Sequence, residues 1–178
     1  MPKTIKNIYD NSVSFENLLK AHKKARCGKR EKKKIILFEL KLEQELLELD
    51  KQLKNGRYKH GGYTKFKIYE PKERIIMASE YKDRVVHQWY VEKFIKPYFV
   101  PQFISTSYAG IEGRGMHKAS KDVQKAMRSA KSKWKNYYIL KMDVTKYFQN
   151  IDKRILWEIL KRKMKDKKLL WLTRKILL

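Results

Sequence analysis

The stretch that decides the expected fold reads YYILKMDVTKYFQNID and spans residues 137–152. Its first eight residues, YYILKMDV, form a compact apolar run with the length and composition of a buried β-strand. Asp143 lies at the end of this run, and a turn with Tyr147 and Phe148 follows. Because a strand end holds a carboxylate in place and leaves room for phosphates, Asp143 is a candidate ligand for Mg²⁺. A lone aspartate after a strand more often begins a turn or caps a helix, so this feature needs support from the rest of the chain.

The charge of the chain restricts its partners. Of 178 residues, 44 are Lys or Arg and 19 are Asp or Glu, which gives a formal net charge of +25. A protein this positive attracts polyanions, so nucleic acid, an acidic membrane surface and an acidic protein are the candidate partners. The 11 Tyr and 4 Trp are interleaved with basic residues, which favours nucleic acid because aromatic faces can stack on bases. Hydrophobic residues make up 42% of the chain, enough for a packed core rather than a disordered basic tail.

Cysteine content and hydropathy predict a cytoplasmic protein without a membrane partner. The single Cys27 excludes an intramolecular disulfide framework, and the 4 His leave no closed zinc set. The amino-terminal residues lack the apolar segment of a signal peptide. No apolar run approaches the ~18 residues that would suggest a bilayer span.

Hydrophobic spacing predicts mainly helices with one basic hairpin. Apolar residues three or four apart over 33–54 are typical of an amphipathic helix, which Asn55-Gly56 would end, and Ser14 would cap the helix over 14–26. Alternation over 63–69 is typical of a strand. Turn residues at 70–73 then allow the chain to return as a second strand. The expected elements are helices over 14–26, 33–54, 84–96, 116–133, 153–165 and 167–178, strands over 63–69, 74–78 and 137–144, and a loop over 98–115.

Three segments, in a fixed order, resemble a known family. Arg74 and DRVVHQ at 83–88 come first, SYAGIEGRGMHKA at 107–119 second, and DVTKYFQNID at 143–152 last. Together they are similar to the amino-terminal half of a bacterial reverse transcriptase, an RNA-directed DNA polymerase of the group II intron-like kind. The middle segment looks most like the diversity-generating retroelement branch. The resemblance covers roughly residues 14–178, and the ordered set is more specific than any one of its segments.

The resemblance implies roles for several residues around the nucleotide. Asp143 would be the first catalytic aspartate, with the carbonyl of Val144 as an auxiliary metal ligand. Phe148 would be the steric gate that rejects a ribose 2′-hydroxyl. Arg74 and a hairpin lysine would grip the triphosphate of the incoming dNTP, since fixed cations suit a polyanion. The lysine would be either Lys67 or Lys72.

The resemblance also implies nucleic-acid contacts. Arg114 and the backbone around Gly113 would lie near the template or the nascent pair, where glycine permits close approach. Arg84 and Lys118 would contact nucleic acid, although Arg84 could equally form a structural salt bridge with a neighbouring acid, Asp83 or Glu80. The sequence departs from the intron-type pattern at residues 110–112, where Gly-Ile-Glu replaces the usual Phe-Arg-Pro.

A larger departure concerns the metal site. The second metal-binding motif of the family, Tyr-X-Asp-Asp, is absent, and the only acids after Asp143 are Asp152, Glu158 and Asp166. One aspartate cannot hold the two Mg²⁺ or Mn²⁺ ions of the complete enzyme, so a complete two-metal site is not expected here. We therefore expect a truncated reverse transcriptase fragment that is inactive alone. The alternative is a non-catalytic RNA-binding module of maturase-like or vestigial kind.

The expected fold is α+β, with right-hand polymerase fingers, a helical amino-terminal extension and an incomplete palm sheet. The extension would span 1–56, the fingers 57–136 and the beginning of the palm 137–178. Expected partners are an RNA template, a DNA primer and dNTP, with an accessory protein as a further candidate. Asp152 and Asp166 would lie at helix starts and on solvent faces, and the tryptophans would be buried on helices. Self-association would arise from exposed apolar residues of the last helix, namely Leu169, Leu170, Trp171, Leu172, Ile176 and Leu177.

Overall fold

A computed structural model describes residues 4–177 and shows a mixed α+β protein, 56% helical with a two-stranded antiparallel sheet. The chain divides into two compact units. Unit 1 comprises the residues up to Tyr98 together with those from Lys153 onward, and unit 2 comprises Phe99–Asp152. The elements are α1 (Tyr9–Ser12), α2 (Phe15–Ala25), α3 (Lys33–Glu39), α4 (Leu42–Lys54), β1 (Tyr63–Ile68), β2 (Arg74–Ser79), α5 (Tyr81–Tyr90), the π-helix η1 (Val91–Ile95), α6 (Lys96–Phe99), the 3-10 helix η2 (Val100–Gln102), α7 (Met116–Lys133), α8 (Lys153–Lys163) and α9 (Lys167–Leu177). The predicted division into an extension, fingers and palm, with boundaries after residues 56 and 136, stays a prediction.

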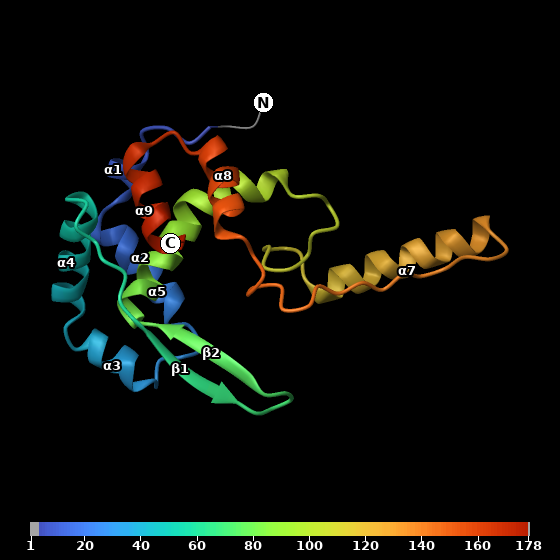
Figure 1. Cartoon of the computed structure of the whole chain (residues 1–178), viewed down its shortest axis with the longest axis horizontal. Helices are drawn as coiled ribbons and strands as arrows, with labels where there is room; N and C mark the ends of the chain where they lie inside the picture. Colours follow the sequence, from blue (N-terminus) through green and yellow to red (C-terminus); the bar gives the residue numbers. More distant parts are fainter. Residues whose placement is uncertain (1–3, 178) are drawn as a thin grey trace. The chain divides into compact units, whose positions relative to one another are not determined.

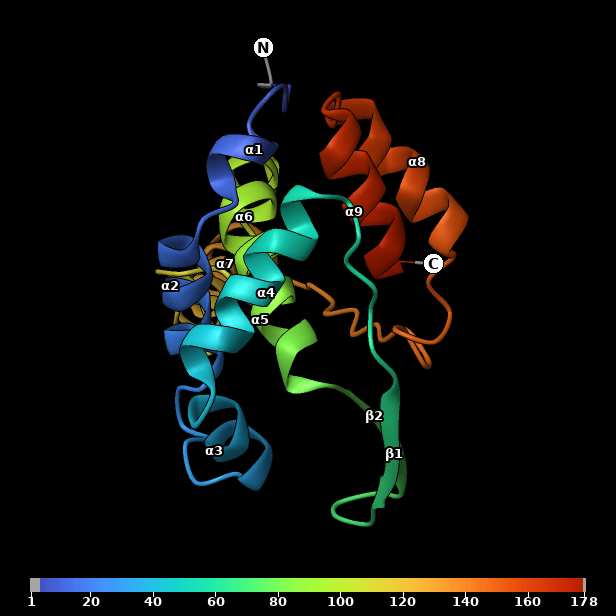
Figure 2. The same cartoon turned by 90° about the vertical axis from the view of Figure 1, so that its left-hand side faces the viewer.

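Helix α2 lies at the centre of unit 1 and packs against both α4 and α5 (Figure 2). The hydroxyl of Ser14 accepts a hydrogen bond from the backbone N–H of Asn17 at 3.2 Å, which confirms Ser14 as the cap that begins α2. Trp89 of α5 is 1% exposed, and its ring meets Tyr9 edge-on with the centroids 5.9 Å apart. The single helix predicted over 33–54 is instead two helices, α3 and α4, because the backbone leaves the helical conformation at Lys41. Their buried residues are Ile35, Phe38, Leu46, Leu49 and Leu53.

Asp166 joins the two ends of unit 1: its predicted place at a helix start is confirmed, and its predicted place on a solvent face is wrong. The side chain is 7% exposed and begins α9, where Oδ1 accepts the N–H groups of Lys168 and Leu169 at 3.1 and 3.2 Å. Its Oδ2 accepts the N–H groups of Ile8 and Tyr9, both at 3.0 Å. One carboxylate therefore satisfies backbone donors at the first turns of α9 and α1, which lie near each other in Figure 1.

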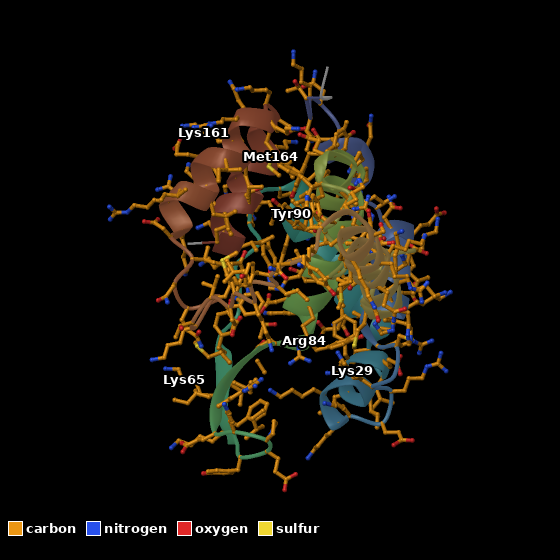
Figure 3. The ribbon with its side chains drawn as sticks, turned by 90° about the vertical axis from the view of Figure 1, so that its right-hand side faces the viewer. Lys29, Lys65, Arg84, Tyr90, Lys161 and Met164 are labelled. Carbon is orange, nitrogen blue, oxygen red and sulfur yellow. The ribbon has the colours of Figure 1, made fainter. Side chains whose placement is uncertain are left out.

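The carboxyl-terminal helix is docked rather than exposed. Leu169 and Leu172 are fully buried, which contradicts the predicted apolar surface at these two positions. Tyr90 of α5 lies against α9, because its hydroxyl is 2.8 Å from the Oγ1 of Thr173 and 3.9 Å from the sulfur of Met164 (Figure 3). Sequence alone could not place this helix, because its partners are more than 70 residues away.

Strands β1 and β2 form the predicted hairpin, in the register Tyr63↔Ser79 to Ile68↔Arg74. The hairpin extends away from the helices of unit 1 in Figure 2, and most of its residues are exposed. An isolated two-stranded hairpin is marginally stable in water, so this one depends on how its base is anchored to the helices.

Unit 2 contains the long helix α7 and an extended return segment. The buried strand predicted over 137–144 is absent: these residues have no regular structure and are exposed. A strand exists through hydrogen bonds to a neighbouring strand, and no partner pairs with these residues in the described part of the chain. Trp134, predicted to be buried on a helix, follows α7 and is 59% exposed.

Self-association is expected at the exposed apolar run 137–144 of unit 2 rather than at α9. Leu140 and Met142 are each 80% exposed, and exposed apolar segments of high β-propensity promote association. Replacing both residues with threonine is expected to reduce aggregation, measured by light scattering at raised salt, where charge repulsion is screened. Replacing the buried Leu169 and Leu172 with threonine should instead unfold unit 1. Equal aggregation of the wild type and the Leu140/Met142 variant would contradict the assignment.

No helix within residues 4–177 is long and apolar enough to cross a membrane.

A buried histidine makes unit 1 sensitive to acid. His22 of α2 is fully buried, its Nε2 is 3.1 Å from the Glu39 carboxylate, and its Nδ1 is 3.0 Å from the Tyr81 hydroxyl. Nδ1 accepts from the tyrosine and Nε2 donates to the glutamate, which is the arrangement of a neutral ring. Burial lowers the pKa of His22 against the opposing effect of Glu39, and burial likewise lowers the pKa of His87.

Stability is therefore expected to fall on acidification. The unfolded chain takes up protons at about pH 6.5, whereas the folded chain takes them up at lower pH, so the free energy of unfolding decreases as the pH drops below about 6.5. Urea unfolding between pH 7.5 and 5.5 measures the effect. His22→Gln should flatten part of this dependence, and the exposed His117→Gln in unit 2 serves as the control. A urea midpoint that rises toward pH 5.5 would show that the buried rings take up protons in the fold.

Candidate nucleic-acid interface

The β1–β2 hairpin presents cations and apolar side chains on both faces. Lys67 lies opposite Ile75, and Ile68 lies opposite Arg74. Because side chains alternate along a strand, Lys67 and Arg74 point to opposite faces. Lys72 lies in the connecting turn and is exposed. The structure therefore does not bring Lys67 and Arg74 to one side of the hairpin. Lys72 lies in the turn between the strands, so the strand register does not assign it to either face.

One face, here called the Lys67 face, is the more open. Lys67 donates to the carboxylate of Glu73 at 2.8 Å, but both side chains are more than half exposed, and such a pair contributes only about 0 to 1 kcal/mol. A phosphate can therefore replace Glu73 at little cost. On the opposite face, Lys34 of α3 donates to the Oγ1 of Thr64 at 3.0 Å, so α3 approaches that side. The Lys67 face carries Tyr63, Lys65, Lys67, Ile75 and Met77.

The base of the hairpin is fastened to α5 by a buried carboxylate. Asp83 is fully buried, and it accepts hydrogen bonds from the hydroxyl of Tyr58 at 2.7 Å and from the backbone N–H of Gly61 at 2.9 Å. A Cβ at Gly61 would lie 2.9 Å from Asp83 Oδ2 and 3.1 Å from the Glu80 carboxyl group, so a larger residue there would displace the Asp83 carboxylate. Burial and the bond to Asp83 raise the pKa of Tyr58, which keeps its hydroxyl protonated as a donor.

Two histidines cover this anchor. His60 stacks on His87 with the ring centroids 5.2 Å apart and on Tyr63 at 5.0 Å. The Nδ1 of His60 is 3.8 Å from Asp83 Oδ2. His87 thus packs at the junction between α5 and the first residues of the hairpin. Sequence reasoning missed Asp83 as the anchor, because its partners lie 22 and 25 residues earlier and no local pattern marks them.

Arg84 is held by the backbone of β2. Its Nε donates to the carbonyl of Ser79 at 3.2 Å, and the side chain is half-buried. The neighbouring Asp83 is committed to Tyr58 and Gly61, so the predicted alternative of a salt bridge with Asp83 is wrong. Arg84 tethers the end of β2 to the first turn of α5.

In unit 2, Arg114 organises the loop before α7. Its Nη1 donates to the carbonyls of Ile104 at 2.9 Å and Ser107 at 3.1 Å. Gly113 has a φ of +74°, and no atom lies within 4 Å of a Cβ placed there, so the backbone conformation rather than crowding requires glycine. The predicted nucleic-acid residues Gly113 and Arg114 therefore shape a turn, which leaves their contact with template a prediction.

The first turns of α7 are held by a small exposed network. Tyr108 donates to the Asp122 carboxylate at 2.8 Å, and Lys118 pairs with the same carboxylate at 3.2 Å. The hydrogen bond from Tyr108, helped by Lys118, lowers the pKa of Asp122. Lys118 remains about half exposed, so it can also reach an external phosphate.

Asp143 is exposed and lies in an irregular segment. Its Oδ1 accepts the N–H of the next residue, Val144, at 3.0 Å, which is a contact within the same exposed segment. Val144 is 62% and Phe148 84% exposed, and the rings of Tyr147 and Phe148 meet edge-on with their centroids 5.3 Å apart. The predicted catalytic and gating residues thus share one exposed stretch of unit 2, whereas Lys67, Lys72 and Arg74 belong to unit 1.

The residues present do not fit a two-ion metal centre. Within residues 4–177, no three His, Cys, Asp or Glu side chains lie together in a way that could hold a metal ion. Two divalent ions need several carboxylates to balance their charge, and Asp143 supplies one.

No protein-family model matches this sequence, and no curated protein matches it significantly.

Proposed function

We propose that this chain binds RNA, as the fingers and the beginning of the palm of a polymerase similar to reverse transcriptases, and that alone it adds no nucleotides. The observation that carries the proposal is the exposed hairpin. The Lys67 face, which helices leave open, carries Lys65 and Lys67 beside the aromatic ring of Tyr63, in a chain of formal charge +25. Lysines provide the attraction to phosphates, and aromatic rings accept stacked bases.

The proposal extends to the complete enzyme. There an RNA template would direct the addition of dNTP to a DNA primer, with two Mg²⁺ or Mn²⁺ ions bound by Asp143 and by carboxylates that this chain does not contain. Lys72 and Arg74 would meet the triphosphate, since Lys67 lies on the opposite face from Arg74. Phe148 would contact the sugar. Arg84 and Lys118 would contact nucleic acid.

The second candidate is a non-catalytic RNA-binding module. Within residues 4–177, Asp143 belongs to no group of three His, Cys, Asp or Glu side chains that could hold a metal ion, which supports this reading for the chain by itself. The two candidates predict the same RNA binding and differ in chemistry, so a primer-extension assay with an RNA template, a DNA primer, dNTP and Mg²⁺ separates them. We expect no incorporation by this chain alone. Sustained incorporation would show that the chain holds a complete active site.

RNA binding is expected to depend steeply on salt. For single-stranded RNA the slope of log affinity against log salt is about −0.7 per phosphate neutralised. If about six phosphates are contacted, the affinity falls roughly 300-fold between 50 and 200 mM salt. Fluorescence anisotropy with a labelled oligouridine measures the slope, and a flat titration would contradict phosphate binding.

The hairpin is tested by a matched pair of variants. Lys65→Gln with Lys67→Gln removes two cations of the Lys67 face, and it should weaken binding and reduce the slope by about one to two. Lys165→Gln with Lys167→Gln removes two exposed cations next to and within α9 and is the control. Equal affinity and equal slope of these two variants would remove the hairpin from the interface.

A further inference from the structure

A groove of about 370 Å³ lies between α2 and the end of α5 with the π-helix η1, in unit 1. This volume is within the range of sites for small ligands. The groove belongs neither to the hairpin nor to the exposed segment of unit 2. Its lining consists of Asn17, Lys20, Ala21, Lys23, Lys24, Trp89, Glu92 and Lys93.

The floor of the groove is rigid. Trp89 is 1% exposed, and its Nε1 donates to the carbonyl of Ser12 at 3.0 Å. The Nδ2 of Asn17 donates to the same carbonyl at 3.0 Å, which leaves the Oδ1 of Asn17 as an acceptor at the groove. Ala21, 4% exposed, adds a small side chain where a larger one would fill the space. The apolar wall is therefore preformed, so binding a ligand costs little conformational entropy in the wall.

The rim of the groove is strongly positive. Four lysines line it, and the one acid, Glu92, already accepts from Lys24 at 2.8 Å and from Lys96 and Gln88. The formal charge of the lining is +3, from four lysines and one glutamate. Lysine ammonium groups bind phosphate as point charges, while their stems cover apolar surface.

The backbone at the groove is itself unusual. Val91–Ile95 form a π-helical turn between α5 and α6, and this turn carries Glu92 and Lys93 into the lining. π-Helical turns are rare within α-helices and occur frequently at functional sites. The turn is a second observation, independent of charge, that marks this position.

We propose that the groove between α2 and η1 binds one nucleotide of single-stranded RNA, its phosphate among Lys20, Lys23 and Lys93. The base lies against Ala21 and the lysine stems, with Trp89 beneath, and the Oδ1 of Asn17 accepts from a base N–H. The strand must be single because a base enters such a groove only when it is unstacked. This inference rests on the proposed RNA binding and adds a second contact, separate from the hairpin.

The test compares two charge-matched variants in the full chain. Lys20→Gln, Lys23→Gln and Lys93→Gln together neutralise the rim, and Lys165→Gln, Lys167→Gln and Lys175→Gln remove the same charge from exposed positions in and beside α9. Affinity for a labelled oligouridine is measured by anisotropy, and circular dichroism confirms that both variants are folded. The rim variant is expected to bind at least tenfold more weakly than the control.

Crosslinking reports where the RNA lies on the protein, which a change of charge alone would not reveal. An oligouridine containing 4-thiouridine is irradiated with the wild-type protein, and the attachment site is mapped by mass spectrometry. Attachment within residues 17–24 or 89–93 is expected. Equal affinity of the two variants, or crosslinks confined to the hairpin, would contradict nucleotide binding in the groove and would leave the proposed RNA binding by the chain intact. Absence of any RNA binding by the wild type would overturn the proposed function and the groove together.

Discussion

Replacement of Asp166 by alanine is expected to lower the free energy of unfolding by about 3 kcal/mol, because four backbone donors lose their acceptor. Oδ1 accepts from Lys168 and Leu169 and Oδ2 from Ile8 and Tyr9, all within 3.2 Å. The side chain is 7% exposed, so water cannot fully replace it. Both α1 and the first turn of α9 should loosen, and urea unfolding followed by circular dichroism measures the change.

Two variants sharpen this prediction. Asp166→Asn keeps one acceptor oxygen, so it should cost less than alanine. Asp10→Ala removes an exposed carboxylate that pairs with Lys168 at 2.6 Å on the same side of unit 1, and it should cost about 0 to 1 kcal/mol. If Asp166→Ala lowers the free energy of unfolding as little as Asp10→Ala does, the hydrogen bonds of Asp166 to the first turns of α9 and α1 contribute nothing to stability.

Replacement of Asp83 by alanine is expected to have two effects. It leaves the hydroxyl of Tyr58 and the N–H of Gly61 without their buried acceptor, which should cost about 2 to 4 kcal/mol of unfolding free energy. It also frees the base of the hairpin from α5, so RNA affinity should fall even under conditions where the helices remain folded. Hydrogen exchange of the β1 and β2 amides would report the freed hairpin directly.

The control for this prediction is the neighbouring exposed acid. Glu80→Ala removes the same charge beside Gly61 and should leave hairpin exchange unchanged. Asp83→Asn retains an acceptor for Tyr58 and should lie between the wild type and alanine. If the hairpin amides exchange equally in all of these proteins, Asp83 is not the anchor.

Local pattern predicted the parts of the fold that local chemistry controls. The cap at Ser14 and the stop at Asn55 bound helices as expected, and the alternation over 63–69 produced β1 in the predicted hairpin. These features depend on the 3.6-residue and 2-residue periods and on side chains that bond within three or four residues.

The candidate site was predictable in part. Lys67, Lys72 and Arg74 belong to the predicted hairpin, but the register separates Lys67 and Arg74 onto opposite faces. Asp143 ends an apolar run, yet no strand forms there because strand pairing requires a neighbour that sequence spacing does not supply. The reverse transcriptase resemblance therefore stays a prediction that the experiments above address.

By itself, the sequence determined that this protein carries a large positive charge, forms amphipathic helices and contains a basic hairpin. Only the tertiary structure decided which carboxylates are buried: Asp83 fastens the hairpin, and Asp166 caps two helices, while Asp143 stays exposed. It also decided that lysines of α2 and η1 share a groove over Trp89. The reason is that periodicity reflects neighbours along the chain, whereas burial and hydrogen bonding of a polar side chain depend on partners that only folding brings near.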